Sequence, residues 1–275
     1  MYRCDLCPHM CVIKPGGTGF CRARGVSDAG VVSLSYGKLT SVALDPIEKK
    51  PLYHFCPGSM ILSVGSFGCN LRCPWCQNSY ISMAGVEDVE LHDIGPEALC
   101  ALAERYVSEG NIGVAFTYNE PLINFEYVLD ASERLKERGL MSVLVTNGYA
   151  NPEYFDKLLP FVDAMNIDLK GIDDSVYPRI KGDVETVKQN IRSAAGRCHV
   201  ELTCLLINGV NDSEREMEEL TNFVASVSPD IPLHISRFFP RHEMEDKEQT
   251  TIESMKRFEE IARRKLTHVH LGNVR

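Results

Sequence analysis

The chain of 275 residues has no apolar run of 18 residues and no excess of positive charge. A helix that spans a membrane needs about 20 consecutive apolar residues, so we expect no span. Lysine and arginine number 29 against 38 aspartates and glutamates, a net charge of −9. This charge disfavours a non-specific hold on nucleic acid or on an anionic membrane. Residues 1–14 lack the apolar core of a secretory signal, and we therefore expect a cytoplasmic protein.

Cysteine, in contrast, is abundant, with 11 residues. Cytosolic thiols are kept reduced, so a disulfide framework is not expected. Seven cysteines form two groups: Cys4, Cys7, Cys11 and Cys21, and then Cys69, Cys73 and Cys76. Close spacing in a reducing compartment indicates bound metals or clusters. The scattered Cys100, Cys198 and Cys204 are expected to be small buried residues, and Cys56 stays unassigned.

From residue 60 onward, short apolar runs alternate with helical patterns. Strands are expected at 60–66, 112–117, 141–146, 162–169, 200–207, 232–238 and 268–271, and helices at 96–108, 122–138, 152–159, 184–195, from the cap at 211–213 to about 227, and 250–264. Six such units imply parallel strands joined by right-handed crossovers. An α/β fold of either an open doubly wound sheet or a partial (β/α)6 barrel satisfies this pattern. In both folds ligands bind at the carboxyl ends of the strands.

The first 56 residues have a different character. Residues 1–30 are rich in cysteine, glycine and proline without an apolar period, so a bound metal is expected to replace the missing core. Residues 31–44 alternate around a Tyr-Gly-Lys turn, which predicts a hairpin. We therefore divide the chain into a Cys-rich metal-binding extension with a hairpin, residues 1–56, and a barrel, residues 57–275.

The four cysteines of this extension have the right number of thiolates to close a coordination sphere. A structural zinc site and an auxiliary [4Fe-4S] cluster both use four cysteines. The spacing leaves both open, and we give zinc a slight preference.

The second group lies in the sequence Gly-Cys-Asn-Leu-Arg-Cys-Pro-Trp-Cys-Gln-Asn, residues 68–78, directly after the first strand. Three thiolates on one loop can occupy three corners of an iron–sulfur cube, which leaves one iron open for a non-protein ligand. A catalytic zinc keeps a vacant position by the same logic. A zinc site here would need a fourth protein ligand, and only a residue distant in sequence could supply it.

This loop resembles the cluster loop of the radical S-adenosylmethionine superfamily, which also places it after the first strand of a β/α repeat. In that superfamily the open iron is chelated by the amino and carboxylate groups of S-adenosylmethionine, and an electron from the cluster releases a 5′-deoxyadenosyl radical that abstracts hydrogen from the substrate. The protein positions the cofactor and excludes water. The resemblance implies a partial (β/α)6 TIM-like barrel with a [4Fe-4S] cluster on Cys69, Cys73 and Cys76.

The end of the second strand matches the family in part. Related activating enzymes have a Gly-Gly-Glu-Pro-like turn that binds the amino group of the cofactor. Here Glu120 and Pro121 match, whereas Tyr118 and Asn119 replace the glycines. The resemblance implies that Asn119 and Glu120 contact the cofactor, since a carboxylate accepts strong hydrogen bonds from an ammonium group. Taken alone, Glu120 is also typical of an acid at a helix N-terminus.

The third and fourth strands also end in matching residues. Thr146 and Asn147 belong to a Thr-Asn-Gly turn similar to that of pyruvate formate-lyase activating enzymes, although Val145 replaces the aspartate found there. An ordinary turn would have the same Asn-Gly pair. Asp168 and Lys170 share one face of their strand and match the Asp-x-Lys motif that touches the cofactor in the family. A surface ion pair is the alternative.

Three further residues are candidates for cofactor contact. Trp75, between two cluster ligands, is expected to pack on the adenine, as the aromatic residue of the family does. His234 and Arg237 lie on opposite faces of the sixth strand, and either could contact cofactor or substrate. A lone histidine in a strand is also typical of a satisfied core residue. No residue is assigned as catalytic.

Four segments narrow the resemblance further, namely residues 4–11, 45–55, 68–78 and 234–238. Together they resemble the AmmeMemoRadiSam-system radical enzymes, a group similar to pyruvate formate-lyase activating enzyme, over nearly the whole chain. Longer members continue into a C-terminal ribbon with paired cysteines after a Leu-Gly-Asn-Val segment. This chain stops at that segment, either naturally or by truncation.

The resemblance leaves the substrate open. It implies hydrogen abstraction from a glycyl radical protein, or radical modification of a peptide or small molecule. A non-catalytic zinc or iron–sulfur adaptor and an electron carrier are the alternatives from another class. Expected partners are a reductant such as flavodoxin or ferredoxin and a protein or peptide substrate. The sequence does not give the oligomeric state.

Overall fold

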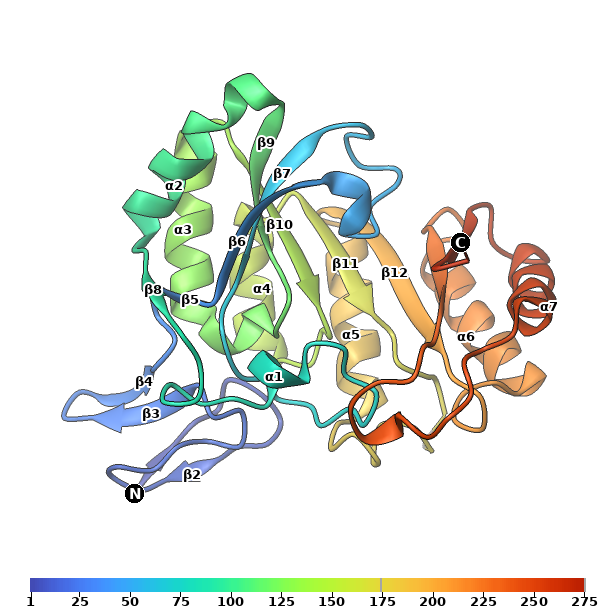
Figure 1. Cartoon of the computed structure of the whole chain (residues 1–275), viewed down its shortest axis with the longest axis horizontal. Helices are drawn as coiled ribbons and strands as arrows, with labels where there is room; N and C mark the ends of the chain where they lie inside the picture. Colours follow the sequence, from blue (N-terminus) through green and yellow to red (C-terminus); the bar gives the residue numbers. More distant parts are fainter. Residues whose placement is uncertain (174, 275) are drawn as a thin grey trace.

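The computed structural model describes residues 1–173 and 175–274. Its centre is an eight-stranded sheet in the order β14-β13-β12-β11-β10-β9-β7-β6 (Figure 1). The strands are β6 (Ser41–Pro46), β7 (Met60–Gly65), β9 (Asn111–Phe116), β10 (Met141–Thr146), β11 (Ala164–Asp168), β12 (His199–Leu206), β13 (Leu233–Arg237) and β14 (Val269–Gly272). Strand β7 and strands β9 to β14 pair in parallel, and β6 pairs antiparallel with β7. The predicted strands are therefore confirmed.

One helix separates each pair of consecutive parallel strands. The helices are α2 (Pro96–Arg105), α3 (Phe125–Glu137), α4 (Pro152–Leu158), α5 (Val184–Ala195), α6 (Glu214–Val227) and α7 (Ile252–Arg263). The spatial order of the parallel strands is their order in sequence, so right-handed crossovers place every helix on the same face. A doubly wound sheet would reverse its strand order at one point. The fold is the predicted partial (β/α)6 TIM-like barrel.

Shorter helical turns complete the elements. They are α1 (Ser79–Ser82), η1 (Ile47–Lys49), η2 (Val107–Glu109), η3 (Pro121–Asn124), η4 (Leu159–Phe161) and η5 (His242–Met244). Among the described residues, no helix has the length and apolar character needed to cross a membrane.

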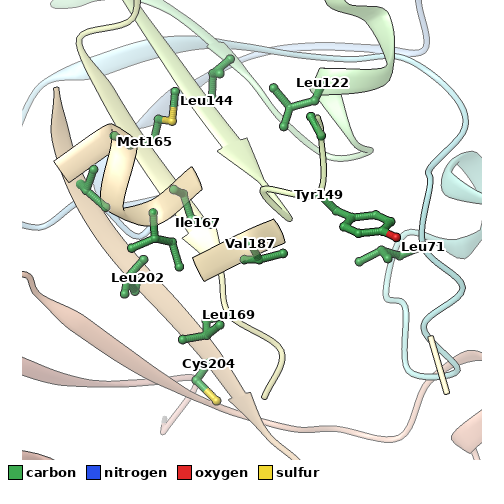
Figure 2. Close-up of a cluster of buried hydrophobic side chains, with 14 of the residues drawn as sticks. Leu71, Leu122, Leu144, Tyr149, Met165, Ile167, Leu169, Val187, Leu202 and Cys204 are labelled. Atoms are coloured by element: carbon green, nitrogen blue, oxygen red, sulfur yellow. The ribbon is translucent and has the colours of Figure 1, made fainter. Parts of the chain in front are cut away.

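The main core lies between the helices and the sheet. Figure 2 shows Met165 and Ile167 of β11 and Leu202 of β12 pointing toward the helical layer, where they join a cluster that includes Val187 of α5. Each such side chain stabilises the fold by about 1.5–3 kcal/mol on burial. Cys204 belongs to this cluster, as does Cys100 of α2, while Cys198 packs against it partly buried. Cys100 and Cys204 are therefore buried core residues, as predicted, whereas Cys198 is only partly buried.

The N-terminal region forms small two-stranded sheets. They pair β1 (Tyr2–Arg3) with β2 (Val12–Ile13), β3 (Arg24–Ser27) with β4 (Gly30–Ser33), and β5 (Lys38–Leu39) with β8 (His92–Asp93). The hairpin predicted over residues 31–44 is therefore wrong. Strand β4 pairs with the preceding β3, and β6 leaves the extension to cover the edge of β7. Alternation of apolar and polar residues predicts that a segment is a strand, but it does not say with which strand that segment pairs. The pairing depends on which strand edges lie next to each other in the folded chain.

The part of the extension that holds β1 to β4 lies at the end of the sheet toward which the strand arrows point, near α1 (Figure 1). Asn151, which precedes α4, donates its backbone N–H to Leu6 O at 3.0 Å. The opposite, amino-terminal end is closed by residues 47–59. There Ile47 and Leu52 pack against Ala164, and Asn166 donates to Pro51 O at 2.8 Å.

Candidate active site at the carboxyl edge of the sheet

The three-cysteine loop begins directly after β7, at the carboxyl edge of the sheet. Burial, together with the neighbouring Glu120 and Cys73, raises the pKa of the Cys69 thiol well above its ordinary value. Burial also raises the pKa of Cys73 to about 12, with the Cys76 thiol adding to the effect. The Cys73 and Cys76 thiols both raise the pKa of Cys69, so the three cysteines, each partly buried, lie near one another on the loop. A raised pKa means that the thiols do not ionise easily by themselves. Metal ligation requires thiolates, and a bound cation would stabilise that ionised form.

The sulfur of Cys69 receives two N–H groups. The Leu71 backbone N–H donates to it at 3.3 Å, and the Asn147 amide donates at 3.7 Å. Donors of this kind orient thiolate ligands and tune the potential of an iron–sulfur cluster. The donor set fits a cluster held by three cysteines.

Asn119 anchors the start of this loop. Its side-chain oxygen accepts the Ser66 N–H at 2.9 Å, and its amide donates to the carbonyl oxygens of Phe67 and Gly68 at 3.1 Å each. The sequence predicted that Asn119 contacts the cofactor. In the structure its polar atoms hold the backbone that leads from β7 to Cys69.

Glu120 has a related positioning role. Its carboxylate is 3% exposed and accepts from the Thr146 hydroxyl at 2.6 Å, the Asn147 N–H at 2.8 Å and the Leu122 N–H at 2.9 Å. Burial raises the pKa of Glu120 to about 7, although these three donors oppose the rise. Glu120 therefore holds the turn after β10 that directs Asn147 toward Cys69.

Asp168 ends β11, and Lys170 follows two residues later; the two side chains form an ion pair of 2.8 Å. Their side chains are 31% and 16% exposed. Burial opposes the charged form of Lys170, but Asp168 and the Cys73 thiol outweigh it and hold the pKa of Lys170 above its usual value. A cation and an anion thus stand together beside the cysteine loop, where they suit a zwitterionic ligand.

Trp75 is buried in the same loop. Among the described residues its indole N–H has no hydrogen-bond partner, which is uncommon for a buried donor. The neighbouring Pro74 carbonyl accepts from the Glu243 N–H at 2.9 Å, which ties the loop to η5. A bound cofactor with ring nitrogens would supply the acceptor that Trp75 lacks.

Two predicted residues lie elsewhere. His234 is near the start of β13, in the amino-terminal half of the sheet, and contacts the buried Glu201 carboxylate at 2.6 Å. Arg237 ends β13 but donates to Thr250 O at 2.6 Å and lies over the ring of Phe239. The structure does not bring either residue into contact with the cysteine loop.

Two residues inside the motif were not singled out from the sequence. The Asn70 side-chain oxygen accepts from the Asn147 amide at 3.0 Å, and Asn70 is almost completely buried. The Arg72 guanidinium donates to Cys69 O at 2.7 Å and to Leu71 O at 2.9 Å. The position of both residues between cluster ligands could have pointed to a role in the site. The side chain that Asn70 contacts, Asn147, is distant in sequence, so the contact itself could not be predicted.

Among the N-terminal cysteines, Cys4 donates its backbone N–H to Cys11 O at 2.8 Å. Burial raises the pKa of Cys7 to about 12, and the neighbouring Cys21 and Cys11 contribute. Burial likewise raises the pKa of Cys21, with Cys4 and Cys11 nearby. Across the described residues, no three His, Cys, Asp or Glu side chains are arranged to hold a single metal ion.

Comparison with known proteins agrees with this geometry. The sequence model of the Radical SAM superfamily matches residues 63–222, a range that runs from within β7 through the cysteine loop to β12 and most of α6. The chain is 37% identical to the uncharacterized protein MJ0808 of Methanocaldococcus jannaschii, over 99% of this chain and 81% of that protein. It is 25% identical to a pyruvate formate-lyase-activating enzyme of Clostridium pasteurianum, over 58% of this chain and 67% of that enzyme.

Solved structures show the same architecture. A domain of a pyruvate-formate lyase-activating enzyme from Bacteroides vulgatus superposes with a TM-score of 0.51 at 25% identity, covering 58% of this chain and 99% of that domain. QueE from Escherichia coli superposes with a TM-score of 0.53 at 13% identity, covering 86% of this chain and 94% of QueE. The second likeness concerns the fold alone.

Proposed function

The chain belongs to the radical SAM superfamily of enzymes, and from this premise we propose that it cleaves S-adenosylmethionine reductively at a [4Fe-4S] cluster held by Cys69, Cys73 and Cys76. When bound, the reduced cluster supplies the electron that converts the cofactor to methionine and a 5′-deoxyadenosyl radical, which abstracts hydrogen from the substrate. The observation that carries the proposal is the loop of three partly buried cysteines at the carboxyl edge of the barrel, where the Leu71 N–H and the Asn147 amide donate to Cys69 Sγ. That edge is where barrel enzymes carry their active sites.

The surrounding residues bind and orient. Three cysteines leave one iron of a cube for the amino and carboxylate groups of the cofactor. Lys170 and Asp168 lie beside Cys73 and match the charges of that zwitterionic end. The unpaired indole N–H of Trp75 is available to the adenine.

We propose a glycine of a partner protein as the hydrogen donor, because the chain is similar to pyruvate formate-lyase-activating enzymes. Radical modification of a peptide or small molecule is the second candidate.

The two candidates are separated by electron paramagnetic resonance. Activation predicts that the reconstituted protein, mixed with S-adenosylmethionine and a glycyl radical protein of the same genome, generates a glycyl doublet. A small-molecule or peptide reaction predicts no doublet under those conditions.

The proposal further includes a metal on the N-terminal cysteines, a one-electron reductant such as flavodoxin or ferredoxin, and a cytoplasmic location.

The reaction itself is tested with anaerobically reconstituted protein, dithionite and S-adenosylmethionine. We expect 5′-deoxyadenosine from the wild type and none from Cys73→Ala, because the loss of one thiolate removes a cluster ligand. Cys198→Ala, in neither cysteine group, should form product at the wild-type rate. Equal product from Cys73→Ala would contradict the proposal, and no product from an iron-loaded wild type would leave an adaptor or electron carrier as the better description.

A further inference from the structure

The backbone at Lys170 lies just beyond the reach of strand pairing. Strand β11 ends at Asp168, and the Leu169 N–H donates to Thr203 O of β12 at 2.9 Å. Lys170 comes next, and its ammonium pairs with Asp168 at 2.8 Å. A cation that binds a ligand at a defined place needs a fixed backbone. The position of this lysine therefore depends on contacts outside the sheet.

Two buried side chains bind the two polar groups of the Lys170 backbone. The Tyr177 hydroxyl accepts the Lys170 N–H at 3.3 Å, and the Asn211 amide donates to Lys170 O at 3.0 Å. Tyr177 and Asn211 are both almost completely buried. The loss of either partner would leave a polar group of the lysine backbone unpaired in a dry environment, which is costly.

Asn211 also ties Lys170 to the neighbouring strand. The same amide donates to Leu205 O at 2.8 Å, and the side-chain oxygen of Asn211 accepts the Ile207 N–H at 2.8 Å. Leu205 belongs to β12, and Ile207 follows the end of that strand. One side chain therefore fixes the backbone of Lys170 relative to the carboxyl end of β12.

Glu216, in the first turn of α6, binds the next N–H groups along the chain. Its buried carboxylate accepts from the Ile172 N–H and, at 3.2 Å, from the Asp173 N–H. A Cβ added to Gly171 would lie 2.9 Å from this carboxylate and 2.7 Å from Val176. The segment directly after the lysine is therefore both hydrogen-bonded and tightly enclosed.

Tyr177 belongs to a segment that also contacts the three-cysteine loop. In this segment, which precedes α5, Ile180 O accepts the Arg72 N–H at 2.9 Å. A Cβ added to Gly182 would lie 2.7 Å from Leu71 and 3.1 Å from the Tyr177 ring. Leu71 and Arg72 lie between the first two cysteines of the loop. The segment thus joins the cysteine loop to the hydroxyl that holds the lysine backbone.

We infer that Tyr177, Asn211 and Glu216 are positioning residues, which hold the Lys170 ammonium where it binds the anionic end of S-adenosylmethionine. The inference rests on the proposed function for the identity of this ligand. All three side chains bind the backbone at or next to Lys170, so they act through that residue. Their removal should therefore weaken binding only while the ammonium is present.

Tyr177→Phe tests the hydroxyl, because it keeps the ring. We expect the Kd of anaerobically reconstituted protein for S-adenosylmethionine to rise about five-fold, measured by equilibrium dialysis. Tyr127→Phe is the matched control, since this buried tyrosine of α3 donates its hydroxyl to Ile94 O at 2.8 Å. The control should keep the wild-type Kd, and an equal Kd in both variants would overturn the role of Tyr177.

Asn211→Asp keeps the acceptor for Ile207 and loses the amide that donates to Lys170 O. We expect its Kd for S-adenosylmethionine to rise about ten-fold. Asn111→Asp is the matched control, because Asn111 is equally buried and donates to Ala103 O at 2.8 Å from the start of β9. Both variants should lose stability to urea, but only Asn211→Asp should lose affinity. The same loss of affinity in both would make Asn211 a residue of the fold alone.

A double-mutant cycle separates positioning from a general loss of stability. Tyr177→Phe and Glu216→Gln should each raise the Kd about five-fold in the wild-type background. Lys170→Met removes the ammonium, and in that background neither change should raise the Kd further, because the group that they position is absent. Structural damage independent of Lys170 would multiply the effects instead, and such multiplication would overturn the inference.

Hydrogen exchange of the full chain without S-adenosylmethionine gives a readout that does not depend on the reaction. The Lys170 amide should exchange faster in Tyr177→Phe, and the Ile172 and Asp173 amides faster in Glu216→Gln, whereas Tyr127→Phe should keep the wild-type rates. Unchanged exchange in the first two variants would show that these side chains do not hold the backbone.

The two readouts distinguish the inference from the proposed function. Faster exchange in these variants, together with a wild type that neither binds nor cleaves S-adenosylmethionine, would contradict the proposed function and the ligand of Lys170, but not the contacts that hold its backbone. A wild type that cleaves S-adenosylmethionine, with an unchanged Kd in Tyr177→Phe, Asn211→Asp and Glu216→Gln, would retain the proposed function and overturn the inference.

Discussion

Gly68 is the residue on which the two parts of the chain meet. Its φ of +83° lies in the left-handed region, and an added Cβ would collide with the backbone of Cys21 and approach Ala23 and Ile123 at 3.1 Å. Glycine is therefore required at this position for two separate reasons, its backbone conformation and the close approach of the extension.

Gly68→Ala is expected to destabilise the chain beyond the cost of the backbone conformation alone. Gly58→Ala is the matched control, because Gly58 has a φ of +82° and no atom within 4 Å of an added Cβ. The control should cost about 1–2 kcal/mol and Gly68→Ala clearly more, by urea denaturation. Equal losses in the two variants would mean that the contact with Cys21 is not tight in solution.

Glu120 is also tested at the residue scale. Glu120→Gln replaces one carboxylate oxygen by an amide that cannot accept from the N–H groups of Asn147 or Leu122. We expect the turn after β10 to shift and the affinity for S-adenosylmethionine to fall about ten-fold, or about 1.4 kcal/mol. Equilibrium binding to the reconstituted protein measures this. Exposed Glu104→Gln should bind normally, and normal binding by Glu120→Gln would remove Glu120 from the site.

At the scale of elements, helix α5 shows how local chemistry places a boundary. Asp183 precedes the helix, and its carboxylate accepts the N–H groups of Glu185 at 2.9 Å and Thr186 at 3.2 Å. Val184, Val187 and Ile191 then follow at helical spacing and pack against the sheet.

Asp183→Ala should therefore reduce the free energy of unfolding by about 1–2 kcal/mol, the usual cost of losing an N-cap. The neighbouring Glu185→Ala, which removes an exposed ion pair with Lys188, should change it by less than about 0.5 kcal/mol. Chemical denaturation of both variants gives the comparison. A larger loss for Glu185→Ala would show that the cap bond contributes little.

At the scale of the whole molecule, the segment between β6 and β7 is hydrogen-bonded to β12, in the opposite half of the sheet. Glu201 of β12 accepts the N–H groups of Tyr53 at 3.1 Å and His54 at 2.7 Å, and also contacts His199 and His234. Burial alone would raise the pKa of Glu201, but these four donors hold it well below its usual value. The ring of His270 in β14 stacks on that of His234.

Acid should weaken this arrangement. Burial and the neighbouring His234 and His54 lower the pKa of His270 from 6.5 to about 4. Since the unfolded chain then binds more protons than the folded one, the free energy of unfolding falls as the pH drops from about 6.5 to about 4. The lowered pKa of Glu201 adds a further loss below the ordinary carboxylate pKa.

Urea midpoints at pH 7.5, 6 and 5 measure this dependence. His270→Asn should reduce the loss between pH 7.5 and 5 by about 1 kcal/mol, since partial exposure screens the effect. His92→Asn, at an exposed position, should keep the wild-type slope. The same slope in His270→Asn would exclude His270 as a source of the acid sensitivity.

Local spacing in the sequence determined the strands and helices of the barrel, the three-cysteine loop and the shared face of Asp168 and Lys170. Each of these depends on residues close in the chain, because the periods of helices and strands and the reach of one loop are local properties. The division of the chain near residue 56 stays a prediction, although β6 of the first part pairs with β7 of the second.

Tertiary structure alone decided which distant segments meet. It chose a barrel over a doubly wound sheet, paired β6 with β7, and placed His234 on Glu201 away from the cysteine loop. It also brought the extension onto the three-cysteine loop, where His9 contacts Asn70 O and Arg72 donates to Phe20 O. These contacts join residues tens of positions apart, and they form only where packing of the whole chain brings complementary edges, charges and hydrogen-bonding groups together.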